Sequence, residues 1–230
     1  MIQEIKKHIP NLFTLGNLAC GFIAIFFILK GYSVIWACWL VMLAGVLDFF
    51  DGFVARALKV SGELGKQLDS LADMVTFGVV PGFLAYYVGA SDSWLMFAAA
   101  ALIPLFSALR LAKFNIDERQ HDTFIGVPTP MNTFFWVGLV FLTNQYPLFA
   151  DVVSAPNVFY FLSIFSAFML VAELPMLALK FKKLDKQFYI KLFVFVIPCI
   201  VGIIILGFAA FAPIYFYYLI CSVLFKFAAK

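Results

Sequence analysis

The sequence places four aspartates within stretches that are otherwise apolar, at Asp48, Asp51, Asp69 and Asp73. Moving an ionised carboxylate into hydrocarbon is costly, so an acidic residue in such a stretch usually serves a function. The first two aspartates are three residues apart and the last two are four apart, so the members of each pair share one face of a helix. Two antiparallel helices joined by a short turn would direct all four carboxylates at one another.

Clustered carboxylates predict a metal site. In a low-dielectric setting their charges repel strongly, and divalent cations remove that conflict. Carboxylate oxygens suit hard ions such as Mg²⁺ or Mn²⁺, and two ions roughly 3.5–4 Å apart can bind one phosphate between them. We therefore expect two divalent cations and a phosphate-containing substrate.

The residues between the two aspartate pairs are suited to a phosphate ligand. Gly52 and Ala55 keep one helix face small, which allows a bulky group to approach the backbone. Arg56 supplies a planar, permanently charged donor. Gly62 and Gly65 bracket a turn and leave further space around it.

Two alternatives compete with a phosphate-binding metal site. The aspartates could pair with Arg56, Lys59 and Lys66 in a solvated loop, but Asp48 follows an unbroken apolar run that starts at Ser33. A cation transporter would also use membrane carboxylates, often within inverted repeats. Here the acidic residues lie in one adjacent pair of segments, and no second half of the chain repeats them.

The composition indicates that membrane-spanning helices position the four aspartates. The 230-residue chain is 64% hydrophobic and 13% charged. Apolar runs of roughly 20 residues predict an all-α polytopic membrane protein. We expect one membrane domain, residues 1–230, with about eight transmembrane helices, and a tight helical hairpin at Phe211–Pro213. The predicted spans are 12–30, 33–57, 66–90, 93–113, 129–146, 155–180, 188–209 and 211–228.

The distribution of basic residues predicts the orientation. With a cytoplasmic N-terminus, all the lysines and arginines except Lys30 fall on the inner side. This places both termini in the cytoplasm and the aspartates near the cytoplasmic face. We expect no cleaved signal peptide. The net charge of +3 is suited to anionic lipid headgroups and needs no nucleic-acid partner. The four cysteines, none in a CxxC pair, are expected to be packing residues.

The aspartates belong to a longer pattern, Asp-x-x-Asp-Gly-x-x-Ala-Arg, eight residues, then Gly-x-x-x-Asp-x-x-x-Asp. This pattern resembles the motif of the CDP-alcohol phosphotransferase family, with every fixed position filled. The resemblance implies that the first three aspartates bind two metal ions, which hold the pyrophosphate of a CDP-linked lipid. Asp73, a fourth candidate ligand, would be the general base that deprotonates the acceptor hydroxyl while CMP leaves. It also implies a homodimer in a bacterial or archaeal cytoplasmic membrane.

A polar stripe of Asn11, Thr14 and Asn17 begins the first span. Helix capping by Asn11 and a backbone hydrogen bond from Thr14 would explain part of it. By resemblance, this segment lines the nucleotide site together with residues of the motif: Gly52, Ala55, Arg56 and Gly65.

Three stretches within the first 135 residues or so resemble the membrane-integral phosphatidylserine synthases of that family: Leu68–Gly78, Phe106–Asn115 and Phe124–Pro130. The implied reaction joins CDP-diacylglycerol and L-serine. Other acceptors, such as glycerol 3-phosphate or an inositol phosphate, would call for more converging basic residues.

Two residues are candidates for binding serine. Arg110 suits its carboxylate, because guanidinium binds carboxylate at two points, although it would also suit an interfacial cation. Glu173, expected in the sixth span next to Pro175, is a candidate for the amino group, or else pairs with Lys180 or faces water. His8 and His121 lack partners at suitable spacing. Their positions suggest no role.

Overall fold

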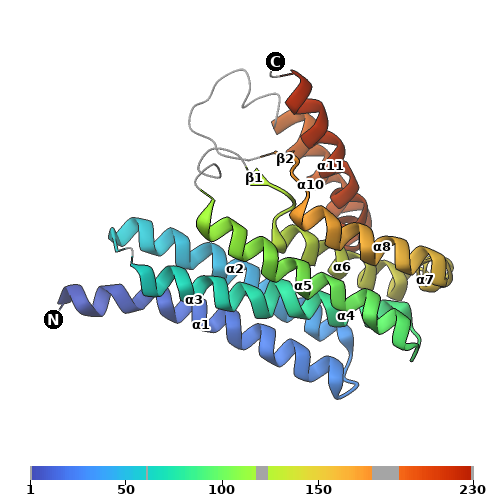
Figure 1. Ribbon diagram of the computed structural model, residues 1–230, viewed down its shortest axis with the longest axis horizontal. Helices are drawn as coiled ribbons and strands as arrows, with labels where there is room; N and C mark the ends of the chain where they lie inside the picture. Colours follow the sequence, from blue (N-terminus) through green and yellow to red (C-terminus); the bar gives the residue numbers. More distant parts are fainter. Residues whose placement is uncertain (1, 61, 118–123, 178–191, 229–230) are drawn as a thin grey trace.

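The computed structural model describes residues 2–60, 62–117, 124–177 and 192–228 (Figure 1). Its N-terminal half is a set of long helices that lie alongside one another (Figure 1). A continuous helical stretch contains a π-helical segment, η1, between α3 and α4. The elements of this half are α1 (Ile2–Leu29), α2 (Val34–Leu58), α3 (Glu63–Asp73), η1 (Met74–Val79), α4 (Val80–Gly89) and α5 (Trp94–Ile116).

The C-terminal half adds further helices and one short strand pair. β1 and β2 are antiparallel, with Phe124 opposite Met176 and Ile125 opposite Pro175. Helices α10 and α11 stand at an angle to the long N-terminal helices (Figure 1). The elements are β1 (Phe124–Ile125), α6 (Thr129–Gln145), α7 (Pro147–Ser154), α8 (Pro156–Val171), β2 (Pro175–Met176), η3 (Leu192–Val196), α10 (Ile197–Leu206), η4 (Gly207–Ala210) and α11 (Phe211–Ala228).

The prediction of an all-helical polytopic membrane protein is confirmed, although the number of spans differs. By length and composition, the described residues contain five helices able to cross a membrane, or six if α7 and α8, bent by 76°, form one span. The expected number of eight exceeds the count of six for two reasons. With 17 residues, α6 is only about 25 Å long, less than a hydrocarbon core of roughly 30 Å. Residues Leu192–Phe225, expected as two spans, count as one by length and composition, although α10 and α11 are separated by the turn η4.

Within Leu192–Phe225 the chain folds back on itself. Gly207, at a φ of 59°, begins the turn η4. The ring of Phe195 then stacks on that of Tyr217 at 5.9 Å, and the Tyr217 hydroxyl donates to the carbonyl of Val194. The predicted hairpin exists, but its turn precedes Phe211–Pro213, because glycine adopts this left-handed backbone conformation readily.

The expected sixth span ends earlier than predicted. Helix α8 stops at Val171, so Glu173 lies in an irregular segment before β2, where it is exposed. Its predicted position inside a helix is therefore wrong. A residue that precedes proline is biased toward extended backbone, and the following Pro175 pairs with β1. His121, Arg119 and the predicted inner lysines at 180, 182, 183, 186 and 191 lie outside the described residues.

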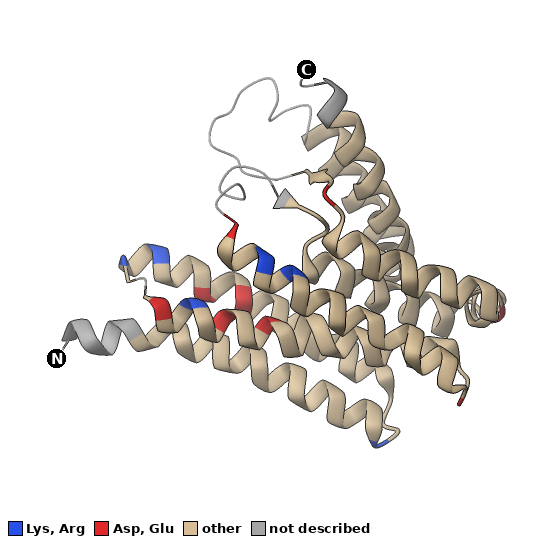
Figure 2. Ribbon diagram, viewed as in Figure 1, with Lys and Arg blue, Asp and Glu red and all other residues tan. Residues whose placement is uncertain are grey.

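Apolar side chains lie both on the outer surface and in the core, and a smaller set of polar side chains is buried among the helices. Phe22, Trp36 and Phe49 are each more than 60% exposed, as expected for side chains that face hydrocarbon. Inside, Phe135 of α6 stacks on Tyr215 of α11 with ring centres 4.6 Å apart. The charged positions gather mainly toward one end of α2, α3 and α5 (Figure 2).

Candidate active site

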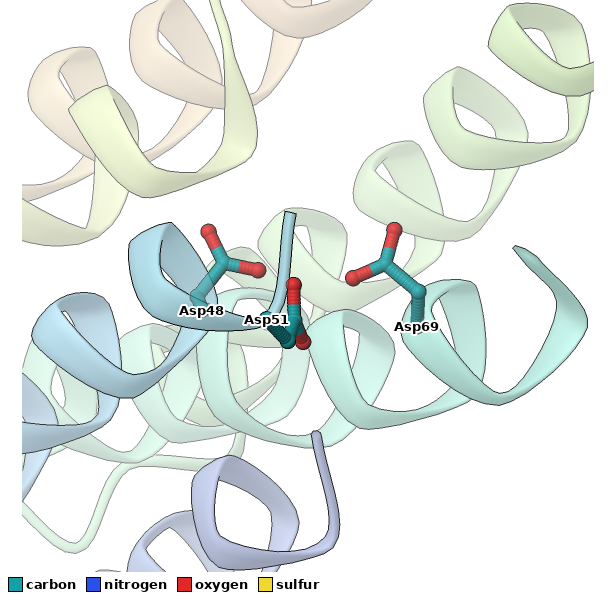
Figure 3. Close-up of side chains that lie close together, drawn as sticks. All are labelled: Asp48, Asp51 and Asp69. Atoms are coloured by element: carbon teal, nitrogen blue, oxygen red, sulfur yellow. The ribbon is translucent and has the colours of Figure 1, made fainter. Parts of the chain in front are cut away.

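Three of the four aspartates form one group. Asp48 and Asp51 come from α2 and Asp69 from α3, and each offers a carboxylate oxygen within 4.8 Å of the others. Figure 3 shows the carboxylates of Asp48 and Asp69 directed toward each other, with Asp51 between them. The tight turn from α2 to α3 makes this possible, since Lys59 adopts a left-handed conformation (φ 54°) that ends α2.

The donor set of this group suits a divalent cation. All three ligand atoms are hard carboxylate oxygens, which Mg²⁺ and Mn²⁺ prefer. Asp51 is buried and the other two are half-buried. Their mutual repulsion in this setting would be relieved by cation binding. The residues present therefore fit the expected metal centre.

Helix α1 supplies hydrogen bonds to the aspartates. The buried Thr14 hydroxyl donates to Oδ2 of Asp51 at 2.7 Å, with the carbonyl of Pro10 as a second acceptor at 3.2 Å. Nδ2 of Asn17 donates to Oδ1 of Asp73 at 3.4 Å. The polar stripe of α1 thus faces the aspartates, and the backbone hydrogen bond expected for Thr14 is present as well.

Asp73 lies beside the three-aspartate group without belonging to it, and its side chain interacts with that of Asp48. It is the last residue of α3, directly before the π-helical η1. Such π-helical turns occur frequently at functional sites. Two hydroxyls anchor η1: Thr133 donates to the carbonyl of Phe77 at 2.9 Å, and Thr76 donates to that of Asn17 at 3.1 Å. No feature of the sequence predicted the π-helical segment.

A cavity of about 390 Å³ opens beside Asp51 and Asp69. This volume lies within the range of small-molecule sites, roughly 300–1,000 Å³. The lining includes five of the seven residues predicted to bind the CDP-linked lipid: Asn11, Thr14, Gly52, Ala55 and Gly65. The other two have different surroundings, Asn17 beside Asp73 and Arg56 on the exposed surface next to Gly52.

Two of the residues that line the cavity but were not predicted to bind carry side chains able to donate hydrogen bonds. His8 and Lys66 both line it, although the sequence suggested no role for His8 and only a loop ion pair for Lys66. Lys66 also donates through Nζ to the carbonyl of Asn115 at 3.3 Å, which ties α3 to the end of α5. Helical spacing was an available signal, because His8 lies three residues before Asn11 and Lys66 three before Asp69.

Arg110 of α5 is buried, with 7% of its surface exposed. Its Nη1 donates to the hydroxyl of Thr129 at a long 3.5 Å, and its Nε has no hydrogen-bond partner among the described residues. The guanidinium lies 5.6 Å from the ring centre of Phe114 and interacts electrostatically with Asp73. This burial disfavours the role of an interfacial cation that extends to water. Glu173, in contrast, is exposed.

Comparison with known proteins identifies the family of this chain. Residues 7–164 match the CDP-alcohol phosphatidyltransferase family, and the chain therefore belongs to that family. A CDP-diacylglycerol–serine O-phosphatidyltransferase of Helicobacter pylori is 41% identical over 140 residues, which are 60% of this chain and 59% of that protein. The protein of the same name from Bacillus subtilis is also 41% identical over 140 residues, or 78% of its length.

An archaetidylserine synthase of Methanothermobacter thermautotrophicus is 34% identical over 126 residues, which are 54% of this chain and 53% of that protein. The similarity thus spans about three fifths of the Helicobacter relative's length and about half of the archaeal one's.

Proposed function

We propose that this protein transfers the phosphatidyl group of CDP-diacylglycerol to the hydroxyl of L-serine, giving phosphatidylserine and CMP. The observation that carries the proposal is the three-aspartate group beside a cavity of about 390 Å³, in a family that acts on CDP-linked alcohols. The names of its relatives support serine as the acceptor.

The cavity residues would bind the nucleotide part of the lipid. Asn11 presents an amide beside Gly65, whose missing side chain leaves room, since a Cβ there would lie 3.4 Å from Oδ1 of Asn11. Lys66 and His8 add donors to the lining. Asp48, Asp51 and Asp69 would hold two Mg²⁺ or Mn²⁺ ions, which supply charge neutralisation for the pyrophosphate when bound. Thr14 would keep Asp51 oriented for this role.

Asp73 would act as the general base. Asn17 orients its carboxylate through the bond to Oδ1. The proton of the serine hydroxyl passes to Asp73, and the hydroxyl oxygen forms a bond to the β-phosphorus of CDP-diacylglycerol. The bond from that phosphorus to the oxygen bridging the two phosphates breaks, and CMP leaves with that oxygen.

Arg110 would bind the carboxylate of serine. A guanidinium that is buried with an unpartnered Nε has donors available for a two-point interaction. Arg110 also lies in the electrostatic field of Asp73, which supports an acceptor whose carboxylate meets Arg110 while its hydroxyl meets Asp73. Glu173 would contribute only if the exposed segment before β2 approached the bound amino group.

The basic residues and the sources of the relatives support a location for the protein. We infer that the protein lies in the cytoplasmic membrane of a bacterium or archaeon, with both termini in the cytoplasm, and that it forms a homodimer, as the family resemblance implies. The support is the asymmetry of basic residues and the bacterial and archaeal sources of its relatives.

Release of CMP by the purified protein tests the proposal. CDP-diacylglycerol and Mn²⁺ or Mg²⁺ are supplied with L-serine, glycerol 3-phosphate or inositol phosphate in turn. We expect release with serine alone, and loss of release on chelation. Release with another acceptor would refute the assignment of serine, and no release with any acceptor would refute the transferase activity.

A further inference from the structure

The segment after α8 crosses the start of α6 as a strap, defined here as residues 172–177. Its β2 strand pairs with β1. Beyond the pair, the amide of Gly126 donates to the carbonyl of Leu174 at 2.9 Å, and the amide of Val127 donates to that of Met169 at 3.0 Å. Gly126 has a φ of 76°, and a Cβ there would collide with the carbonyl of Leu170. The strap and the entry to α6 are therefore in close backbone contact.

Helix α11 binds the end of this strap. The amide of Leu177 donates to the hydroxyl of Ser222 at 3.0 Å, and the hydroxyl of Tyr218 donates to the carbonyl of Leu177 at 3.2 Å. Ser222 in turn donates to the carbonyl of Tyr218 at 2.7 Å. All three residues are buried. Two side chains thus satisfy both backbone groups of one strap residue, which would otherwise remain unpaired in an apolar interior.

The strap is connected to Arg110 through its partner strand β1 and the start of α6. The chain runs from β1 through Gly126 and Val127 into α6, where Thr129 accepts the bond from Nη1 of Arg110. Thr129 lies at the start of α6 and is a hydrogen-bond partner of the guanidinium, at 3.5 Å, so a shift of the start of α6 would move this partner relative to Arg110.

We propose that Tyr218 and Ser222 are positioning residues for the acceptor, acting through the strap and Thr129 on Arg110. This inference rests on the proposed function, because it assumes that Arg110 binds the acceptor. Both residues lie beyond the family match, which ends at residue 164. The last helix would therefore act on the acceptor side while leaving the cavity beside Asp51 and Asp69 unaffected.

Kinetics of Tyr218→Phe and Ser222→Ala test the inference, with Tyr217→Phe as the matched control. Tyr217 lies on the same helix, and its hydroxyl bonds to Val194 and not to the strap. Loss of one buried hydrogen bond predicts a rise of roughly threefold to tenfold in the KM for serine, with the KM for CDP-diacylglycerol nearly unchanged. Because both residues act through Leu177, the double variant should show less than the product of the single effects.

Amide hydrogen exchange provides a second readout that needs no catalysis. Exchange at Gly126, Val127 and Leu177 should accelerate in Tyr218→Phe and Ser222→Ala and stay at the wild-type rate in Tyr217→Phe. An equal rise in both KM values, or unchanged exchange, would overturn the inference. If the wild-type protein uses another acceptor, the proposed function fails. The inference is then tested by comparing the KM for that acceptor with the KM for CDP-diacylglycerol in the same variants, together with their amide hydrogen exchange.

Discussion

The hydrogen bond from Thr14 to Asp51 provides a quantitative test of the metal centre. Thr14→Val replaces the hydroxyl with a methyl group of similar size at a site that is only 3% exposed. The lost bond has a length of 2.7 Å and an ionised acceptor, which corresponds to about 1.5–3 kcal/mol. Removing a residue that orients a metal ligand typically lowers metal affinity or activity roughly 10- to 100-fold.

The assay measures the Mn²⁺ concentration that gives half-maximal CMP release, together with direct Mn²⁺ binding by electron paramagnetic resonance. We expect Thr14→Val to raise that concentration by about 10- to 100-fold, and Thr14→Ser, which keeps the hydroxyl, to remain near wild type. Thr143→Val is the matched control, since Thr143 bonds only to backbone carbonyls of its own helix. A wild-type Mn²⁺ response in Thr14→Val would refute the positioning role of Thr14.

Three further results are expected. Asp73→Asn should lose turnover and keep CDP-diacylglycerol binding, and near-normal CMP release would exclude Asp73 as the base. Arg110→Lys should raise the KM for serine well above tenfold, because lysine cannot form the two-point bond; an unchanged KM would refute that contact. Gly138→Ala should lower the stability to unfolding in detergent by about 1–3 kcal/mol, because its Cβ would lie 2.8 Å from that of Phe211. Gly202→Ala, where the nearest atom would be 3.8 Å away, is its control, and equal thermal shifts would contradict the packing argument.

Some features of the site could be predicted from the sequence because they depend on local spacing. Apolar runs and the basic-residue asymmetry predicted a helical membrane protein, and the separations within each aspartate pair predicted shared helix faces. The structure brings Asp48, Asp51 and Asp69 together as expected. The turn that joins the two helices is only a few residues long, so their facing sides follow almost directly from the periodicity of the helix.

Other features depend on contacts between distant segments, which helical periodicity does not encode. Thr14 meets Asp51 across 37 residues and Asn17 meets Asp73 across 56, contacts that depend on how α1 packs against α2 and α3. The burial of Arg110 likewise depends on its neighbouring helices. The early end of α8 follows from pairing between β1 and β2, two segments 50 residues apart in the chain. The sequence by itself determined which aspartates share a helix face, and the tertiary structure decided which groups contact them.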